Sequence, residues 1–183
     1  VINVIDFGMP NSQAVPDDFD GDGLTDYAIY QASTGTWLAL LSASGYARAS
    51  AVLGGTSFSP LSADFDGDKK ADPTVYNATT GDWIILLSAS GYQSVSARFG
   101  GSGFVTAPAD FDADDKADPI VYQESSGTWM ALLSGSGYCR VSGVFGGPGY
   151  SPLTADYDGD RCADVAIYQR NSGLWTVVNY HGH

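Results

Sequence analysis

The chain repeats itself every 46 residues, and this period constrains its fold more than any other feature. Tryptophan recurs at this spacing, at Trp37, Trp83, Trp129 and Trp175. An acidic cluster that begins at Asp18 returns at the same interval, as does an apolar residue followed by glycine, first seen at Phe7. Four such periods nearly equal the 183 residues of the chain. A repeat of this length indicates similar supersecondary units, each packed on its neighbours.

Composition favours strands over helices within each repeat. The chain has one Glu and three Lys, residues that normally build surface helices, but 23 Gly and 11 Tyr. In the second repeat we predict strands at residues 60–65, 71–77, 82–88 and 94–100, with a tight turn at Thr79-Thr80-Gly81. We therefore predict an all-β protein without helices.

Four antiparallel strands in about 46 residues are typical of one propeller blade. We predict a single four-bladed β-propeller over residues 1–183, with blades at about 15–54, 60–100, 106–146 and 152–180. The N-terminal residues 1–8 align with the ends of the other repeats, so residues 1–7 are expected to pair with residues 174–180 and close the ring in blade four. An eight-bladed ring made from two chains is the alternative.

The recurring aromatic residues are interpreted mainly as core. A large aromatic at the same strand position of each blade favours packing between blades over a sugar-stacking platform. The same interpretation applies to Tyr30, Tyr76, Tyr122 and Tyr168. Another set follows Ser-Gly in loops and is a better candidate for exposure: Tyr46, Tyr92 and Tyr138.

The acidic loops carry the chemistry. Each repeat places Asp at positions 1, 3, 5 and 9 of a nine-residue loop between two strands. The sets are Asp18, Asp20, Asp22 and Asp26; Asp64, Asp66, Asp68 and Asp72; Asp110, Asp112, Asp114 and Asp118; and Asp156, Asp158, Asp160 and Asp164. Four carboxylates this close repel one another unless a cation neutralises them, whereas turn-forming Asp residues need no such register.

Calcium is the cation that this donor set favours, at about four ions per chain. Calcium accepts roughly 6 to 8 oxygen ligands in flexible geometry, whereas magnesium retains its waters and a strict octahedron. The backbone carbonyl at loop position 7 is expected to add a ligand, from Leu24, Lys70, Lys116 and Cys162. The loop is not an EF-hand, because the twelfth residue counted from Asp18 is Ile29 rather than Glu.

The motif resembles a known repeat family. Asp-Phe-Asp-Gly-Asp followed by Asp four residues later, with Phe-Gly-Gly before it, is similar to the FG-GAP/VCBS repeats, and the similarity extends over the whole chain. The resemblance implies an integrin-α-like propeller with calcium in the loop of each blade, located outside the cell and serving adhesion or carbohydrate binding. Ala113 departs from the pattern, since the other loops have Gly at that position.

Charge and missing motifs exclude several functions. A formal net charge of −13 argues against nucleic acid and anionic membranes. The longest apolar run, residues 83–87, is too short to span a bilayer, and a signal peptide is expected to have been removed already. We find no nucleophile–base set, and His181 and His183 are interpreted as a tail, so an enzyme is not expected.

Two functions remain open at this point. The first is a secreted or cell-surface calcium-dependent module that binds glycans through several similar sites. The second is a structural or adhesion unit of an extracellular assembly, with self-association as one form. Cys139 and Cys162 lie in neighbouring blades, where they would either form a disulfide or remain buried thiols.

Overall fold

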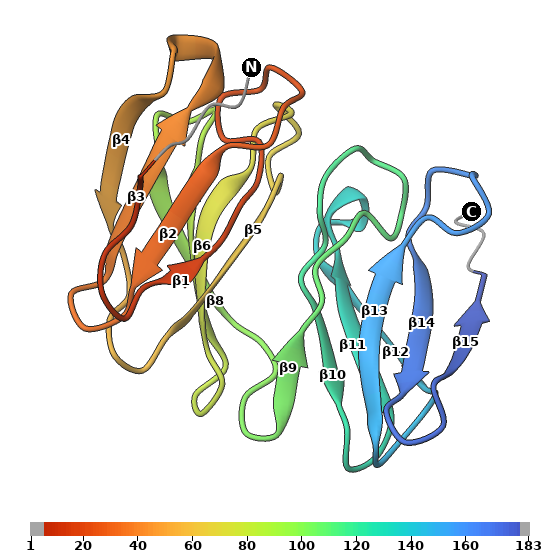
Figure 1. Cartoon of the computed structure of the whole chain (residues 1–183). Helices are drawn as coiled ribbons and strands as arrows, with labels where there is room; N and C mark the ends of the chain where they lie inside the picture. The colour runs from red at the N-terminus through yellow and green to blue at the C-terminus, as the bar shows by residue number, and fades with distance from the viewer. Residues whose placement is uncertain (1–5, 180–183) are drawn as a thin grey trace.

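The chain forms a four-bladed β-propeller of four successive antiparallel sheets (Figure 1). The structure is a computed structural model, and it describes residues 6–179. Three sheets have four strands and the last has three, each in simple sequence order. Figure 1 shows blades one and two on one side of the molecule and blades three and four on the other.

The strands recur at the same places in each repeat. Blade one contains β1 (Gln13–Ala14), β2 (Tyr27–Gln31), β3 (Thr36–Leu41) and β4 (Ala47–Val52). Blade two contains β5 (Ser59–Ala63), β6 (Asp72–Asn77), β7 (Asp82–Leu87) and β8 (Gln93–Arg98). Blade three contains β9 (Phe104–Thr106), β10 (Ile120–Gln123), β11 (Thr128–Leu133) and β12 (Cys139–Val144). Blade four contains β13 (Tyr150–Ala155), β14 (Asp164–Gln169) and β15 (Leu174–Val178).

Two single turns of 3-10 helix, η1 (Ser42–Ser44) and η2 (Ser134–Ser136), depart from the prediction of no helix. Each joins the third strand of its blade to the fourth, and each ends on a glycine in the left-handed conformation. Such short turns are common connectors and need no helix-forming side chains.

Apolar clusters between consecutive blades form the core. Trp37 is 3% exposed, Trp83 1% and Trp129 6%, which confirms their interpretation as core. Each ring packs on the tyrosine opposite it in the preceding strand, as with Tyr76 and Trp83 at 5.1 Å between centroids. Trp175 is 53% exposed, so the same interpretation is wrong there, because no cluster of described residues covers that face of blade four.

Consecutive blades are also joined by one recurring backbone hydrogen bond. The N–H of the residue after loop position 7 donates to the carbonyl of loop position 1 in the preceding blade. The three pairs are Ala71 to Asp18 at 2.7 Å, Ala117 to Asp64 at 2.6 Å, and Ala163 to Asp110 at 2.6 Å. Every acidic loop except the last is therefore part of the contact with the next blade.

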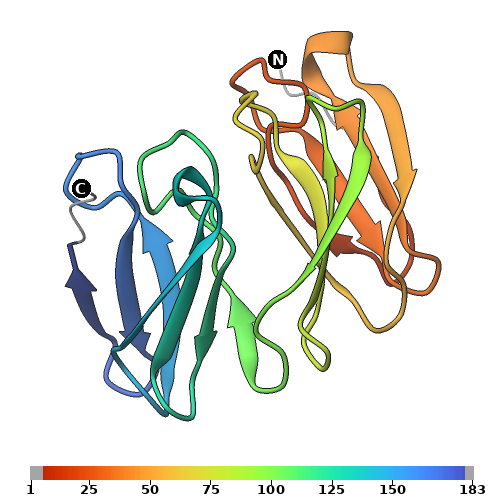
Figure 2. The same ribbon diagram turned by 180° about the vertical axis from the view of Figure 1, so that it is seen from behind.

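The expected closure of blade four by residues 1–7 falls largely outside the described residues. Among those described, β15 pairs with β14 alone, and residues 6–8 belong to no strand. Seen from behind, β15 again lies at the far end of the molecule from blade one (Figure 2).

Candidate metal centres

Each acidic loop connects the first and second strands of its blade, and its backbone adopts an unusual conformation at two positions. Loop positions 4 and 6 adopt the left-handed conformation in all four repeats. Glycine supplies it at Gly21, whereas Ala113 and Lys69 adopt it with φ of 59° and 70°. A side chain makes this conformation costly, so tertiary contacts must hold the loop in place.

The position-1 carboxylates shape the loop by accepting backbone N–H groups. Asp18 accepts from Gly21 at 2.7 Å and from Gly23 at 2.8 Å. Asp64 accepts from Gly67 at 2.6 Å and from Lys69 at 2.7 Å. These bonds turn several N–H groups inward and compensate part of the negative charge.

The position-9 carboxylates are buried and connect the loop to the rest of the blade. Asp72 accepts the Phe65 N–H at 2.9 Å and the Ser88 N–H, from the turn after β7, at 2.7 Å. Asp26 and Asp118 make the same two bonds in their blades. Burial raises the pKa of Asp72 and of Asp118 to about 6, and a nearby cation would favour their ionised forms.

The position-3 carboxylates contain the least satisfied atoms of the site. One oxygen accepts a backbone N–H from the turn after the third strand, as Asp66 does from Ala89 at 2.9 Å. The other oxygen, Oδ1, is buried and has no hydrogen-bond partner in Asp20, Asp66 and Asp112. Burying a carboxylate oxygen without a hydrogen-bond partner costs folding free energy. Because the same oxygen is unpaired in three blades, we infer that it faces a ligand site.

The position-5 carboxylates depend on serines that sequence reasoning missed. Ser42 donates its hydroxyl to Asp22 at 2.9 Å, Ser88 to Asp68 at 3.0 Å, and Ser134 to Asp114 at 2.9 Å. These serines recur at the 46-residue period, which was the available signal. At position 7, the N–H groups of Leu24, Lys70, Lys116 and Cys162 donate to the position-5 Asp of the same loop.

The carboxylates converge in groups of three that fit one cation each. Each group has one oxygen per residue within 4.8 Å of the others: Asp18, Asp20 and Asp22; Asp64, Asp66 and Asp72; Asp110, Asp112 and Asp118; and Asp156, Asp158 and Asp164. In three blades the group unites positions 1, 3 and 9, and in blade one it unites positions 1, 3 and 5. Oxygen-only donors with a buried unpaired oxygen suit a hard divalent ion.

The remaining residues singled out from the sequence belong to none of the carboxylate triads. Cys139 is exposed on β12 and Cys162 is buried in the last acidic loop, and the two form no disulfide, so the disulfide hypothesis is wrong for this structure and the buried-thiol alternative holds for Cys162 but not for Cys139. Tyr46, Tyr92 and Tyr138 are exposed, as expected for loop residues. His181 and His183 lie outside the described residues.

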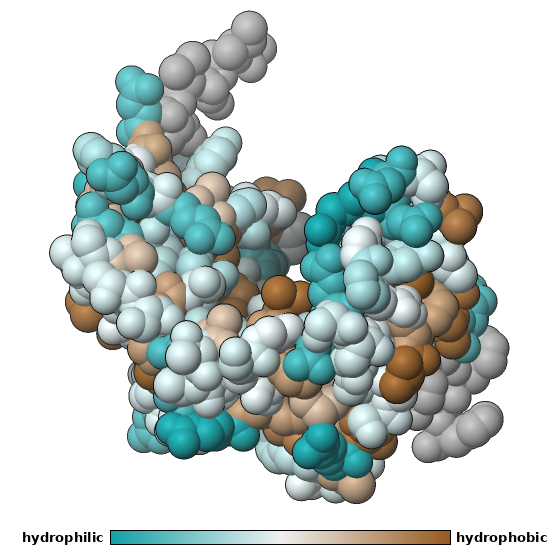
Figure 3. Space-filling view, turned by 90° about the horizontal axis from the view of Figure 1, so that it is seen from below, coloured by the Kyte–Doolittle hydropathy of each residue, from teal (hydrophilic) through white to brown (hydrophobic). Residues whose placement is uncertain are grey.

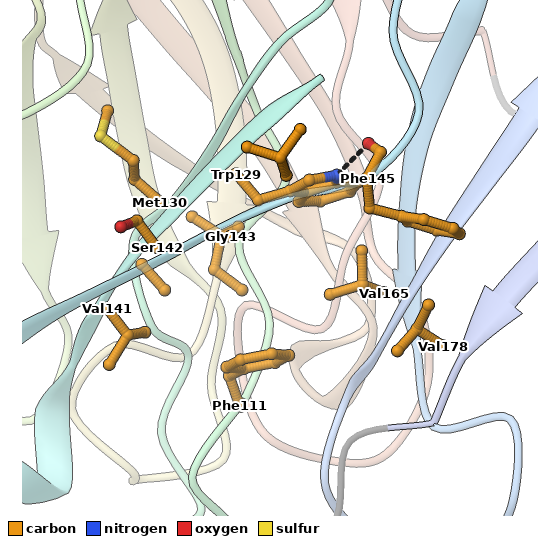
Figure 4. Close-up of a pocket in the computed structure, with 12 residues that line it drawn as sticks. Phe111, Trp129, Met130, Val141, Ser142, Gly143, Phe145, Val165 and Val178 are labelled. Carbon is orange, nitrogen blue, oxygen red and sulfur yellow. Dashed lines mark hydrogen bonds between the residues drawn. The ribbon is translucent and has the colours of Figure 1, made fainter. Parts of the chain in front are cut away.

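A cavity of about 350 Å³ lies between blades three and four (Figure 4). Trp129 lines it and donates its indole N–H to the Phe145 carbonyl at 3.0 Å. Val165 and Val178 reach it from blade four. No ionisable side chain lines the cavity, so we assign it no chemistry.

No protein-family model matches the chain, and no curated protein matches its sequence. Within residues 6–179, no helix has the length and apolar character needed to cross a membrane.

Proposed function

We propose that the four acidic loops bind calcium, one ion per blade, and that they order the propeller by doing so. The observation that carries this proposal is the buried, unpartnered Oδ1 of Asp20, Asp66 and Asp112, each within a convergent Asp triad. Four divalent ions would bring the formal charge of the chain from −13 to about −5. The resemblance to FG-GAP/VCBS repeats supports the same assignment.

We propose further that the protein is a non-enzymatic extracellular module that binds glycans. Tyr92 supports this, because its side chain is only partly exposed and lies near three carboxylates. Partial burial, together with Asp68, Asp72 and the neighbouring blade's Asp20, raises the pKa of its hydroxyl. An aromatic face beside a cation site suits a sugar, which offers both C–H groups and hydroxyls.

The acidic residues outside the loops also support a binding role over catalysis. Asp82 and Glu124 form ion pairs, with Arg98 at 2.8 Å and Arg170 at 3.0 Å. Hydrogen bonds hold both pKa values low, from Arg98 to Asp82 and from the Gly149 N–H and Arg170 to Glu124. A general acid needs its pKa raised instead.

Two measurements test these proposals separately. Calorimetric titration of EDTA-stripped protein with calcium should give about four sites, and an affinity no greater than that for magnesium would refute the metal assignment. A glycan array in calcium and in EDTA should give calcium-dependent binding that Tyr92→Ala weakens and that Val52→Ala, at an exposed site on β4, leaves largely intact. Calcium binding with a blank array would favour the second candidate, a structural or adhesion unit, which the exposed face of blade four supports.

A further inference from the structure

Blade four presents a sheet face that the other blades bury. Trp175 and Val177 are exposed, whereas Trp129 and Ala131, one repeat earlier, are buried in the cluster between blades three and four. All five residues of β15 are exposed. Seen from below, apolar residues in brown reach the surface at this end of the molecule (Figure 3). This face corresponds to the surface of blade three that blade four covers, but no described residue of another blade covers it.

Blade one, at the opposite end, presents the complementary half. Thr25 and Tyr27 are exposed. The residues one repeat later, Ala71 and Pro73, are buried, and they pack against blade one. The same positions are also buried in blade three, at Ala117 and Pro119. Blade one therefore exposes the surface that every later blade uses to sit on its predecessor.

The recurring backbone hydrogen bond has its next donor and acceptor at these two ends. In three interfaces the donor is an alanine N–H and the acceptor is the carbonyl of loop position 1. The next pair in the series consists of the Thr25 N–H and the Asp156 carbonyl, and both residues are exposed. None of the hydrophobic clusters of the described residues joins blade four to blade one.

We propose that a second copy of the chain docks head to tail, so that blade one of each copy covers blade four of the other. The interface reproduces the one that the chain already makes three times, which is why the occupant is another copy rather than an unrelated partner. Head-to-tail contacts form closed rings when the rotation closes, and two copies give eight blades, within the range of known propellers. The proposal does not depend on the identity of the metal.

The test is the mass of the intact protein in solution, measured by light scattering after size exclusion in the presence of calcium. The expected mass is about 38 kDa, twice the 19.2 kDa of one chain. Thr25→Arg on blade one and Val177→Asp on blade four should each give monomers that melt normally, because both positions are exposed in the single chain. Val95→Asp, at an exposed site on β8, is the matched control and should remain dimeric.

Mixing the two variants distinguishes head-to-tail pairing from other dimers. A Thr25→Arg chain retains an intact blade-four face and a Val177→Asp chain an intact blade-one face, so the mixture should recover dimers. A wild-type protein that stays at 19.2 kDa, a dimer that neither variant affects, or a mixture that stays monomeric would each overturn the proposal. Open polymers larger than a dimer would overturn the closed ring as well.

Discussion

Replacing Asp66 by Asn separates a metal-binding loop from a loop that is only a turn. Asp66 uses Oδ2 to accept the Ala89 N–H at 2.9 Å, while its Oδ1 is buried and unpartnered. An Asn in the same rotamer keeps the first bond and places an NH₂ group at the second position, within reach of the Asp64 and Asp72 oxygens. The amide is a donor there, so it cannot ligate a cation, but it can hydrogen-bond those carboxylates.

The sign of the effect therefore depends on the ion. A site saturated at 100 times its dissociation constant stabilises the fold by about 2.7 kcal/mol, and a domain of this size shifts its Tm by about 2–4 °C per kcal/mol. In calcium, Asp66→Asn should lower the Tm by about 5–10 °C. In EDTA it should leave the Tm unchanged or raise it, because it removes a repelling charge and satisfies a buried atom.

The assay is thermal unfolding followed by circular dichroism in calcium, in magnesium and in EDTA. Asp115→Asn is the matched control, since it removes the same charge from an acidic loop at a residue outside the triads. Its Tm should change little in either condition. Equal shifts for both variants in calcium, or a wild-type Tm that EDTA does not lower, would refute the metal assignment.

Three further predictions follow from the packing and the backbone. Ala113→Gly should stabilise the protein by about 1 kcal/mol, seen as a raised denaturation midpoint, because Ala113 has φ of 59°; a lowered midpoint would contradict this. Trp83→Ala should cost about 3–5 kcal/mol in urea unfolding, against less than about 0.5 kcal/mol for the exposed Tyr138→Ala. A thiol reagent should modify Cys139 in the native protein and Cys162 only after unfolding, and rapid labelling of both would contradict their burial.

The 46-residue period made most of the fold predictable. Strands and acidic loops recur in register, so residues such as Asp64, Asp66 and Asp72 were expected together, and their oxygens do converge. The exposure of Trp175 was not predictable from the repeat, because burial depends on whether a neighbouring blade covers the face. The sequence pattern alone cannot distinguish a covered face from an open one.

The hydrogen-bond network of the site was only partly predictable from the sequence. Loop spacing indicated which carboxylates meet, but not that Ser88 and Ala89, from the turn after β7, donate to Asp72 and Asp66. These partners lie 16 and 23 residues along the chain from the carboxylates that they contact. Ala89 contributes only its backbone N–H, which any residue type could supply, so the sequence contains no sign of this contact. Ser88 also uses its hydroxyl, and the recurrence of serine at this position is visible in the sequence.

The hydrogen bond between each alanine N–H and the acidic loop of the preceding blade couples the stability of neighbouring blades. Blades two and three are contacted on both sides, whereas blades one and four are contacted on one side only in the single chain. Linear arrays with nearest-neighbour coupling open from their ends. Amide hydrogen exchange should therefore be slowest in β6 and β10 and faster in β14. Opening of blade one would break the Ala71–Asp18 hydrogen bond and opening of blade four the Ala163–Asp110 bond, so each opening would free one acidic loop from its contact with the adjacent blade.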